Sequence, residues 1–306
     1  MSSRILITGA SGFVGSALVP ALRAGGAQIV RLARGTTIGS APDEEQIPWD
    51  PVKPISPDAL SGFDALIHLA GESVLGRWTA AKKARIRDSR IPTTRHLARA
   101  LSQARNKPKV FLSASAIGYY GDRADEVLNE DSASGSGFAA ELSRELEAAA
   151  LPATEAGIRT AQMRMGIILG KHGGALQTML TPFKMGIGGK LGSGRQWMSW
   201  IDVQDVVGAI QHILNTDQVR GPVNVVAPTP VTNTEFTQTL ARVLSRPAIF
   251  PLPAFAARLV FGQMAYELLL ASQRVQPARL LSSGYIFRVP QLRTSLQGIL
   301  KAESHL

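Results

Sequence analysis

Residues 4–15 have the sequence RILITGASGFVG, and this stretch decides the fold. The apolar run of residues 5–7 is typical of a short buried strand. A helix is predicted next, because apolar residues recur at helical spacing over residues 14–22 and two glycines follow at 25–26. A second strand is expected over residues 28–33. Strand, glycine turn, helix and strand within about thirty residues form a βαβ unit, which predicts a parallel sheet.

The glycines of this stretch stand three residues apart, between the first strand and the helix. Residues without side chains let the backbone approach a pyrophosphate, and the first N–H groups of a helix neutralise its charge. A tight structural turn without a ligand is the alternative. The pattern predicts a dinucleotide site with these candidate cofactor-binding residues: Gly9, Ser11, Gly12, Phe13, Val14 and Gly15.

The end of the second strand favours one nicotinamide cofactor over the other. NAD sites usually place an acid there for the ribose 2′-hydroxyl, whereas a basic residue suits the 2′-phosphate of NADP. Here the chain has Arg34 just beyond the strand and no acid before Asp43. A guanidinium binds phosphate through two parallel hydrogen bonds. We therefore expect NADP(H) as the preferred cofactor, with NAD(H) possible, and we interpret Arg31 as a solvated edge residue.

The rest of the chain continues the alternation of strands and helices up to about residue 170. Strands are predicted over 46–49, 65–70, 109–115, 159–169 and 223–227, and helices over 79–104 and 138–156. The predicted fold is α/β, a Rossmann-like doubly wound parallel sheet with a small mixed C-terminal lobe. We expect residues 1–230 to form the NAD(P)-binding domain, with 170–200 contributing to the substrate lobe. Residues 231–306 are expected to form a C-terminal substrate or lid domain.

Composition excludes several classes of protein. The chain has 306 residues, 45% of them hydrophobic, and no cysteine, so disulfide scaffolds and Cys-ligated metal sites are impossible. No secretory signal or membrane span is found, and a cytoplasmic protein is expected. His68 and His172 have no partners at metal-ligand spacing, so no metal is assigned. The net charge of +10 comes largely from residues 79–104, which we interpret as a solvated or dimer-facing helix. Without a nucleic-acid module, neither a dedicated nucleic-acid role nor a membrane partner is expected.

Longer motifs carry a family resemblance. The glycine turn resembles that of the extended short-chain dehydrogenase/reductases, the nucleotide-sugar epimerase group. Residues 69–72 (LAGE), 113–121 (SASAIGYYG) and 189–200 (GKLGSGRQWMSW) are similar to an epimerase-like subfamily of unassigned activity with a C-terminal domain of unknown function. The resemblance covers essentially the whole chain. It implies a Rossmann-like lobe, a C-terminal substrate lobe, a homodimer as one option, and further cofactor-binding positions at Leu69, Ala70, Gly71 and Glu72.

The resemblance also implies an unusual active site. The family uses a Ser or Thr after the fifth strand and a Tyr-x-x-x-Lys pair on the next helix. Ser115 matches the serine, but Phe138 and Leu142 stand where Tyr and Lys are expected, and neither can carry a proton. Either Tyr119 or Tyr120 does the proton transfer, or the substrate needs no strong acid, or the protein binds dinucleotide without turnover. Both tyrosines have a second interpretation, as aromatic residues that simply pack against a neighbouring loop.

Other residues are candidates for substrate binding or for structural roles. Arg195 and Trp197 place a cation and an aromatic ring in a glycine-flanked loop, which suits an anionic or planar ligand. Ser89 and Arg90 are motif positions that are candidates for pointing inward. Asp202 and Asp205 are interpreted as structural caps.

The sequence thus predicts an NADP(H)-dependent oxidoreductase or epimerase acting on a small carbonyl or sugar-nucleotide-like substrate. The candidate catalytic residues are Ser115, Tyr119 and Tyr120, and the candidate substrate-binding residues are Arg195 and Trp197. The alternative is a non-catalytic dinucleotide-binding protein with a regulatory or scaffolding role.

Overall fold

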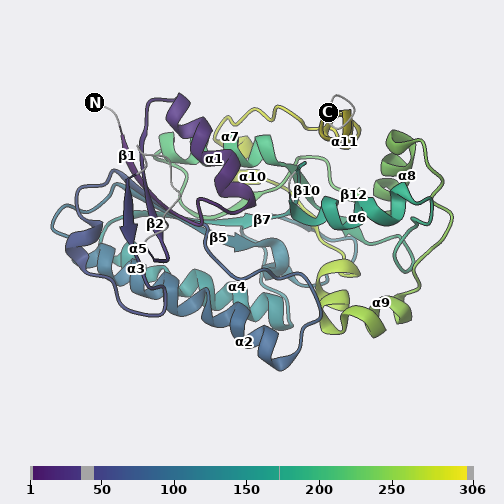
Figure 1. Ribbon diagram of the computed structural model, residues 1–306, viewed down its shortest axis with the longest axis horizontal. Helices are drawn as coiled ribbons and strands as arrows, with labels where there is room; N and C mark the ends of the chain where they lie inside the picture. The colour runs from purple at the N-terminus through teal and green to yellow at the C-terminus, as the bar shows by residue number, and fades with distance from the viewer. Residues whose placement is uncertain (1–2, 36–44, 172, 302–306) are drawn as a thin grey trace.

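A seven-stranded sheet forms the centre of the molecule (Figure 1). The computed structural model describes residues 3–35, 45–171 and 173–301. All neighbouring strands of the sheet run parallel. Their spatial order is β11 (Gly221–Val225), β7 (Arg159–Met165), β5 (Val110–Ala116), β4 (Ala65–His68), β1 (Arg4–Thr8), β2 (Gln28–Ala33) and β3 (Gln46–Pro48).

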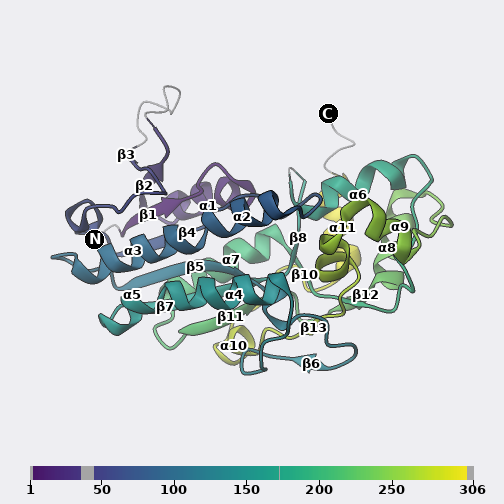
Figure 2. The ribbon, with the colours of Figure 1, turned by 90° about the horizontal axis from the view of Figure 1, so that it is seen from below.

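Helices cover both faces of the sheet (Figure 2). One face carries α1 (Phe13–Ala24) and α7 (Val203–Asn215), and α10 (Ala278–Ser282) lies beside β11. The other carries α2 (Ala80–Asp88), α3 (Ile91–Gln103), α4 (Phe138–Ala149) and α5 (Leu151–Glu155), with the 3₁₀ turns η1 (Pro57–Leu60) and η2 (Ile117–Tyr120). Successive strand side chains alternate between the faces, so Ile5 and Ile7 enter one core and Leu6 the other. This is the predicted Rossmann-like doubly wound sheet.

The C-terminal lobe has small sheets and a core of its own. The parallel pair β8 (Ile167–Leu169) and β10 (Trp200–Asp202) lies near the antiparallel pair β9 (Trp197–Met198) and β12 (Val231–Thr232). Trp200, Phe236 and Leu296 are buried in the core of this lobe. The remaining elements are β6 (Val127–Leu128) paired with β13 (Arg274–Val275), α6 (Gly174–Lys184), α8 (Asn233–Leu244), α9 (Ala254–Phe261), the π-helix η3 (Ala265–Leu269) and α11 (Leu292–Lys301).

Three predicted elements are interrupted. The helix predicted over 79–104 is two helices, α2 and α3, because Pro92 in the first turn of α3 cannot continue a preceding helix. Pro152 likewise separates α5 from α4 within 138–156. The strand predicted over 159–169 breaks at Gly166, where an added Cβ would lie 2.5 Å from the Ser199 carbonyl oxygen. Beyond this glycine the chain leaves the large sheet, and β8 pairs with β10.

The two aspartates interpreted as caps hold helix and loop ends. The Asp202 carboxylate accepts the backbone N–H of Gln204 at 2.9 Å, at the start of α7. Asp205 accepts the backbone N–H groups of Arg288 (2.7 Å) and Val289 (2.8 Å). The two Asp205 bonds attach the C-terminal segment to the first turn of α7.

Candidate functional site

A cavity of about 920 Å³ opens where β1, β2 and β4 end. In the large sheet the strand order reverses between β1 and β4, and ligands of such sheets bind at the carboxyl ends of the strands near this reversal. The cavity is lined by the glycine turn, the end of β2, the loop after β4 and the facing parts of α2 and α3. Its lining residues include Gly9, Ser11, Gly12, Arg31, Arg34, Trp49, Leu69, Ala70, Gly71, Glu72, Arg85, Ser89 and Thr93.

Close backbone contacts explain the glycines of the turn. Gly9 has a positive φ of 70°, and an added Cβ would lie 2.8 Å from the Ala70 nitrogen. A Cβ on Gly15 would lie 2.2 Å from the Gly9 carbonyl oxygen. Gly12 is the N-cap of α1 and offers no side chain to the first N–H groups of the helix. An uncapped helix start beside a cavity suits an anionic group.

A buried pair of side chains ties the glycine turn to the loop after β4. The Thr8 hydroxyl lies 2.6 Å from His68 Nδ1, and it accepts the N–H groups of Leu69 and Ala70, both at 3.2 Å. Burial and, to a smaller extent, the charge of Arg90 lower the pKa of His68 to about 3, so the ring is neutral. Because the Thr8 oxygen accepts two N–H groups, its own proton points to Nδ1. No pattern in the sequence indicates this pair, whose members lie 60 residues apart.

Three arginines line the cavity. Arg34 is exposed at its edge, and Arg31, interpreted from the sequence as a solvated edge residue, is half-buried and lines the cavity. Arg85 lines it from α2. Asp43, the first acid after β2, lies outside the described residues. The described lining near the end of β2 is therefore basic.

Arg90 points inward, as its motif position suggested. Its guanidinium lies directly over Gly71, where an added Cβ would be 2.8 Å from Arg90 Cζ. Burial lowers the pKa of Arg90, and the charge of Glu72 opposes this effect. Glu72 is itself engaged, because Lys82 Nζ donates to its carboxylate at 2.7 Å and holds the pKa of Glu72 below its usual value. This salt bridge leaves the positive charge of Arg90 incompletely balanced beside the cavity.

Phe13 connects the glycine turn to the C-terminal lobe. Added Cβ atoms on Gly170, Gly173 and Gly174 would lie 2.7, 2.7 and 2.8 Å from atoms of the Phe13 ring. These glycines therefore wrap the ring where the loop after β8 passes the start of α1. Sequence reasoning missed this packing, although the glycine cluster was visible.

The predicted catalytic residues lie elsewhere, in a buried group that we call the Arg164 network: Ser115, Tyr120, Glu147, Arg164 and Asn224. The Arg164 guanidinium makes two 2.8 Å hydrogen bonds to the Glu147 carboxylate, which also accepts from the Ser115 hydroxyl at 2.8 Å. The Tyr120 hydroxyl donates to Asn224 Oδ1 at 2.7 Å and accepts from Arg164 at 2.9 Å. None of the three predicted catalytic residues, Ser115, Tyr119 and Tyr120, lines the cavity at the glycine turn.

The two tyrosines differ within this arrangement. Tyr120 is fully buried, and burial raises the pKa of its hydroxyl despite the nearby charge of Arg164. A hydroxyl so enclosed favours the structural interpretation of Tyr120. Tyr119 is half-buried, with the Arg164 guanidinium 3.4 Å above its ring centroid. Its hydroxyl has no hydrogen-bond partner among the described residues.

Apolar side chains pack around the start of α4, and a carboxylate accepts its first N–H groups. The Phe138 ring packs edge-on against Trp78, with centroids 5.0 Å apart, and Leu142 is buried in the same cluster. Glu267 from the C-terminal lobe accepts the N–H groups of Phe138 (3.2 Å) and Ala139 (2.7 Å). The two positions that would carry Tyr and Lys thus serve the packing between α2, α4 and the C-terminal lobe.

The predicted substrate-binding residues also lie outside the cofactor cavity. Arg195 is exposed, and the half-buried Trp197 donates its indole N–H to Asp125 at 2.8 Å. The Arg274 guanidinium lies 4.3 Å from the Trp197 ring centroid. Their role in substrate binding stays a prediction.

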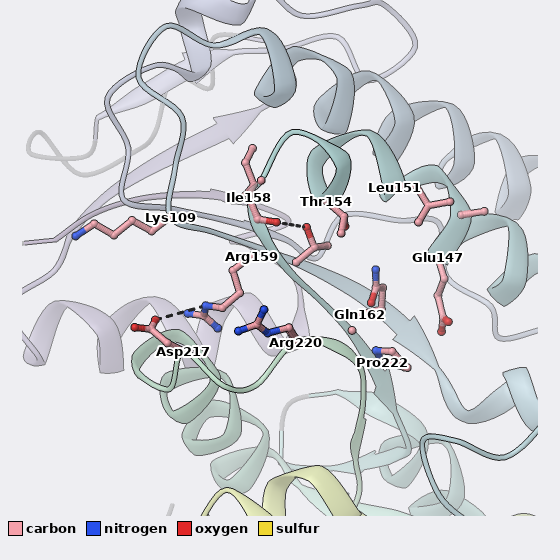
Figure 3. Close-up of a pocket in the computed structure, with 14 residues that line it drawn as sticks. Lys109, Glu147, Leu151, Thr154, Ile158, Arg159, Gln162, Asp217, Arg220 and Pro222 are labelled. Atoms are coloured by element: carbon pink, nitrogen blue, oxygen red, sulfur yellow. Dashed lines mark hydrogen bonds and ion pairs between the residues drawn. The ribbon is translucent and has the colours of Figure 1, made fainter.

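A second cavity, of about 790 Å³, lies at the other end of the strands (Figure 3). It is lined at the starts of β7 and β11 by Lys109, Arg159 and Arg220, among others. The Arg159 guanidinium donates to the carbonyls of Ile213 and Leu214 at the end of α7 and of Val219 in the following loop, and pairs with Asp217 at 3.6 Å. Because Arg159 is committed to these bonds and the cavity is remote from the glycine turn, we place the candidate site at the turn.

The sheet, its strand reversal and the glycine turn define a Rossmann-like dinucleotide-binding protein. The chain belongs to the NAD-dependent epimerase/dehydratase family, whose model matches residues 5–226. A model of a domain of unknown function, DUF1731, matches residues 252–299. The resemblance carried by the sequence motifs is confirmed.

Relatives match the chain over nearly its full length. It is 40% identical over 285 residues to an epimerase family protein of Mycobacterium bovis, covering 92% of this chain and 93% of that protein. It is 36% identical to the human epimerase family protein SDR39U1, covering 97% of this chain and 99% of that protein.

Solved structures agree. The crystal structure of human SDR39U1 with NADPH superposes with a TM-score of 0.89 at 35% identity, covering 97% of this chain and 99% of that chain. A nucleoside-diphosphate sugar epimerase from Corynebacterium glutamicum gives a TM-score of 0.81 at 36% identity, covering 98% of this chain and 58% of that chain.

Proposed function

We propose that the protein is an NADP(H)-dependent oxidoreductase or epimerase that acts on a small carbonyl or sugar-nucleotide-like substrate. Its active site would lack the Tyr-x-x-x-Lys pair of the wider family. The observation that carries the proposal is the cavity at the glycine turn, whose described lining at the end of β2 has Arg31 and Arg34. The relative crystallised with NADPH supports the same cofactor.

The residues present fit a dinucleotide with a 2′-phosphate. The uncapped start of α1 and the close-packed Gly9 and Gly12 would receive the diphosphate. Arg34 would bind the 2′-phosphate, with Arg31 close by. The backbone of residues 69–71, which the Thr8–His68 pair holds in place, would lie along the adenosine half. When bound, such a cofactor supplies hydride transfer at its nicotinamide ring.

Arg90 is a further residue that we assign to this site. It lies over Gly71, half-buried and incompletely balanced by Glu72. A guanidinium in that position would attract an anionic group entering the cavity. Gly71 is needed there because any side chain would displace the guanidinium.

Proton transfer is assigned to Tyr119 rather than Tyr120. The Tyr120 hydroxyl is buried and fully hydrogen-bonded, whereas the Tyr119 hydroxyl keeps both its proton and its lone pairs available. The Arg164 guanidinium lies 3.4 Å from the Tyr119 ring centroid and would fix the orientation of the ring. Ser115, held by Glu147, would orient this region, and Arg195 and Trp197 remain the proposed contacts for an anionic or planar substrate.

The apolar start of α4 favours a second function, that of a dinucleotide-binding protein without catalysis. Phe138 and Leu142 are built into a packed cluster, and neither side chain can carry a proton. Such a protein would bind NADPH and leave every substrate unchanged.

Turnover distinguishes the two functions. The protein is assayed with NADPH or NADP⁺ against a panel of carbonyl compounds and nucleotide sugars. We expect Tyr119→Phe to lower kcat by about 10²–10⁴-fold, as for loss of a positioned acid or base, with NADPH affinity and thermal stability unchanged. Ser115→Ala should also abolish turnover.

Tyr120→Phe is the matched control for the same loss of a hydroxyl. It should chiefly lower stability, by about 1–3 kcal/mol, because buried Asn224 Oδ1 loses its donor and the Arg164 guanidinium loses one of its acceptors. Equal turnover by Tyr119→Phe and the unchanged protein would exclude Tyr119. NADPH binding with no turnover of any substrate in the panel would favour the non-catalytic function.

A further inference from the structure

One end of the molecule carries an exposed apolar surface that the cofactor site does not use. Helices α6, α8 and α9 gather at the end opposite β1–β3 in both views (Figures 1 and 2). Seven large apolar side chains there are between 52 and 74% exposed, and none lines either cavity described above. We call them the apolar patch: Met185, Ile187, Ile249, Phe250, Phe255, Leu259 and Val260.

Main-chain bonds bring the members of the apolar patch together. The N–H of Phe250 donates to the Gly188 carbonyl at 3.2 Å, and the N–H of Leu252 donates to the Lys190 carbonyl at 2.9 Å. The segment after α6 therefore runs beside residues 250–252, and α9 begins at once at Ala254. Phe255 and Leu259 are four residues apart and share one side of α9.

The surroundings of the apolar patch are basic. Residues 173–201 and 236–266 contain no aspartate or glutamate. Within them six cationic residues are exposed: Lys184, Lys190, Arg195, Arg242, Arg246 and Arg258. Lys184 directly precedes Met185, and Arg246 lies three residues before Ile249. Glu235, exposed in the first turn of α8, stands just outside these ranges. Apolar and cationic groups are thus interleaved on a surface where cations outnumber acids.

We propose that this end of the C-terminal lobe docks on an anionic lipid surface. Apolar side chains that enter the boundary of the acyl chains, with Lys and Arg beside the headgroups, are the composition that binds such surfaces. A second copy of the chain is a poor occupant, because two predominantly basic surfaces repel each other. No helix within the described residues is long and apolar enough to cross a membrane. The proposed contact is therefore peripheral.

Vesicle binding tests the proposal with the full chain. The protein is sedimented with vesicles of phosphatidylcholine containing about 30% phosphatidylserine, and with vesicles of phosphatidylcholine alone. We expect at least about tenfold tighter binding to the anionic vesicles, weakened by salt. Phe255→Ser combined with Leu259→Ser, or Lys184→Glu combined with Arg246→Glu, should each reduce that binding by about tenfold or more.

Control variants outside the surface separate this site from general basicity. Ile286→Ser removes a side chain that is 85% exposed, and Arg95→Glu combined with Arg99→Glu reverses two exposed charges on α3. Both should bind anionic vesicles as the unchanged protein does, and every variant should keep its thermal stability and NADPH affinity. Equal binding to both kinds of vesicle, or equal losses in patch and control variants, would overturn the proposal. Binding to polyglutamate but not to anionic vesicles would overturn it in favour of an acidic protein partner.

Discussion

The cavity at the glycine turn and the Arg164 network lie at the ends of neighbouring strands, yet they differ in whether their polar groups have partners within the protein. At the cavity, the first N–H groups of α1 lack a side-chain cap and arginines line open space. In the Arg164 network each hydroxyl, carboxylate and guanidinium is engaged by another side chain. The first region is prepared for a ligand, and the second is complete without one. We expect changes in the network to act on stability, with Ser115→Ala also abolishing turnover, and changes around the cavity to act on affinity.

The largest effect on stability is expected from Glu147→Ala. It leaves the Arg164 guanidinium, whose side chain is 3% exposed, buried without its carboxylate. The free energy of unfolding should fall by about 3–5 kcal/mol in urea denaturation. Glu141→Ala, at an exposed position of the same helix, is the control and should change it by less than about 0.5 kcal/mol. Similar values for the two variants would mean that the network contributes little.

Gly15→Ala should affect both stability and affinity, because Gly15 lies where α1 packs against the turn. The new Cβ would meet the Gly9 carbonyl oxygen and Ala10, so the turn must shift. We expect a loss of about 1–3 kcal/mol in unfolding free energy and no measurable NADPH binding.

Gly298→Ala is the matched control for Gly15→Ala. No atom lies within 4 Å of its added Cβ, and the position is inside α11. It should gain up to about 1 kcal/mol from helix propensity and bind NADPH normally. If Gly15→Ala behaved in the same way, close packing at the turn would be refuted.

The Thr8–His68 pair makes the free energy of unfolding depend on pH. The pKa of His68 is about 3 in the folded state against an unfolded value of 6.5, so between these values the unfolded chain binds more protons. Stability should therefore fall with decreasing pH over this window, with His68 contributing up to about 1.4 kcal/mol per pH unit. In His68→Asn, which keeps an acceptor near the Nδ1 position and does not titrate, the slope should be shallower by this amount. Parallel stability curves for the two proteins would exclude His68 as the source.

Local spacing explains what the sequence predicted well. Strand, glycine turn, helix and Arg34 follow one another within 31 residues, so the fold class and the dinucleotide site could be read from neighbours in the chain. The breaks at Pro92, Pro152 and Gly166 were also local signals, but apolar periodicity on both sides hid them.

Long-range pairing explains what the sequence did not predict. Thr8 meets His68 across 60 residues, and Tyr120 meets Asn224 across 104. Motif position alone therefore made Tyr120 a catalytic candidate, although the fold encloses its hydroxyl. Likewise, the exposed apolar patch depends on residues 188–190 lying beside residues 250–252. Neither segment reveals this contact by itself.

The most direct test of the account is the affinity of Arg34→Ala for NADPH and for NADH, measured by equilibrium titration alongside Arg99→Ala on α3. A charge-assisted contact to the 2′-phosphate contributes about 1.5–3 kcal/mol, so NADPH affinity should fall by about 10–100-fold. NADH affinity and thermal stability should not change, and Arg99→Ala should bind both as the unchanged protein does. Equal losses for NADPH and NADH, or no loss for either, would contradict the assignment of the cavity to a 2′-phosphorylated dinucleotide.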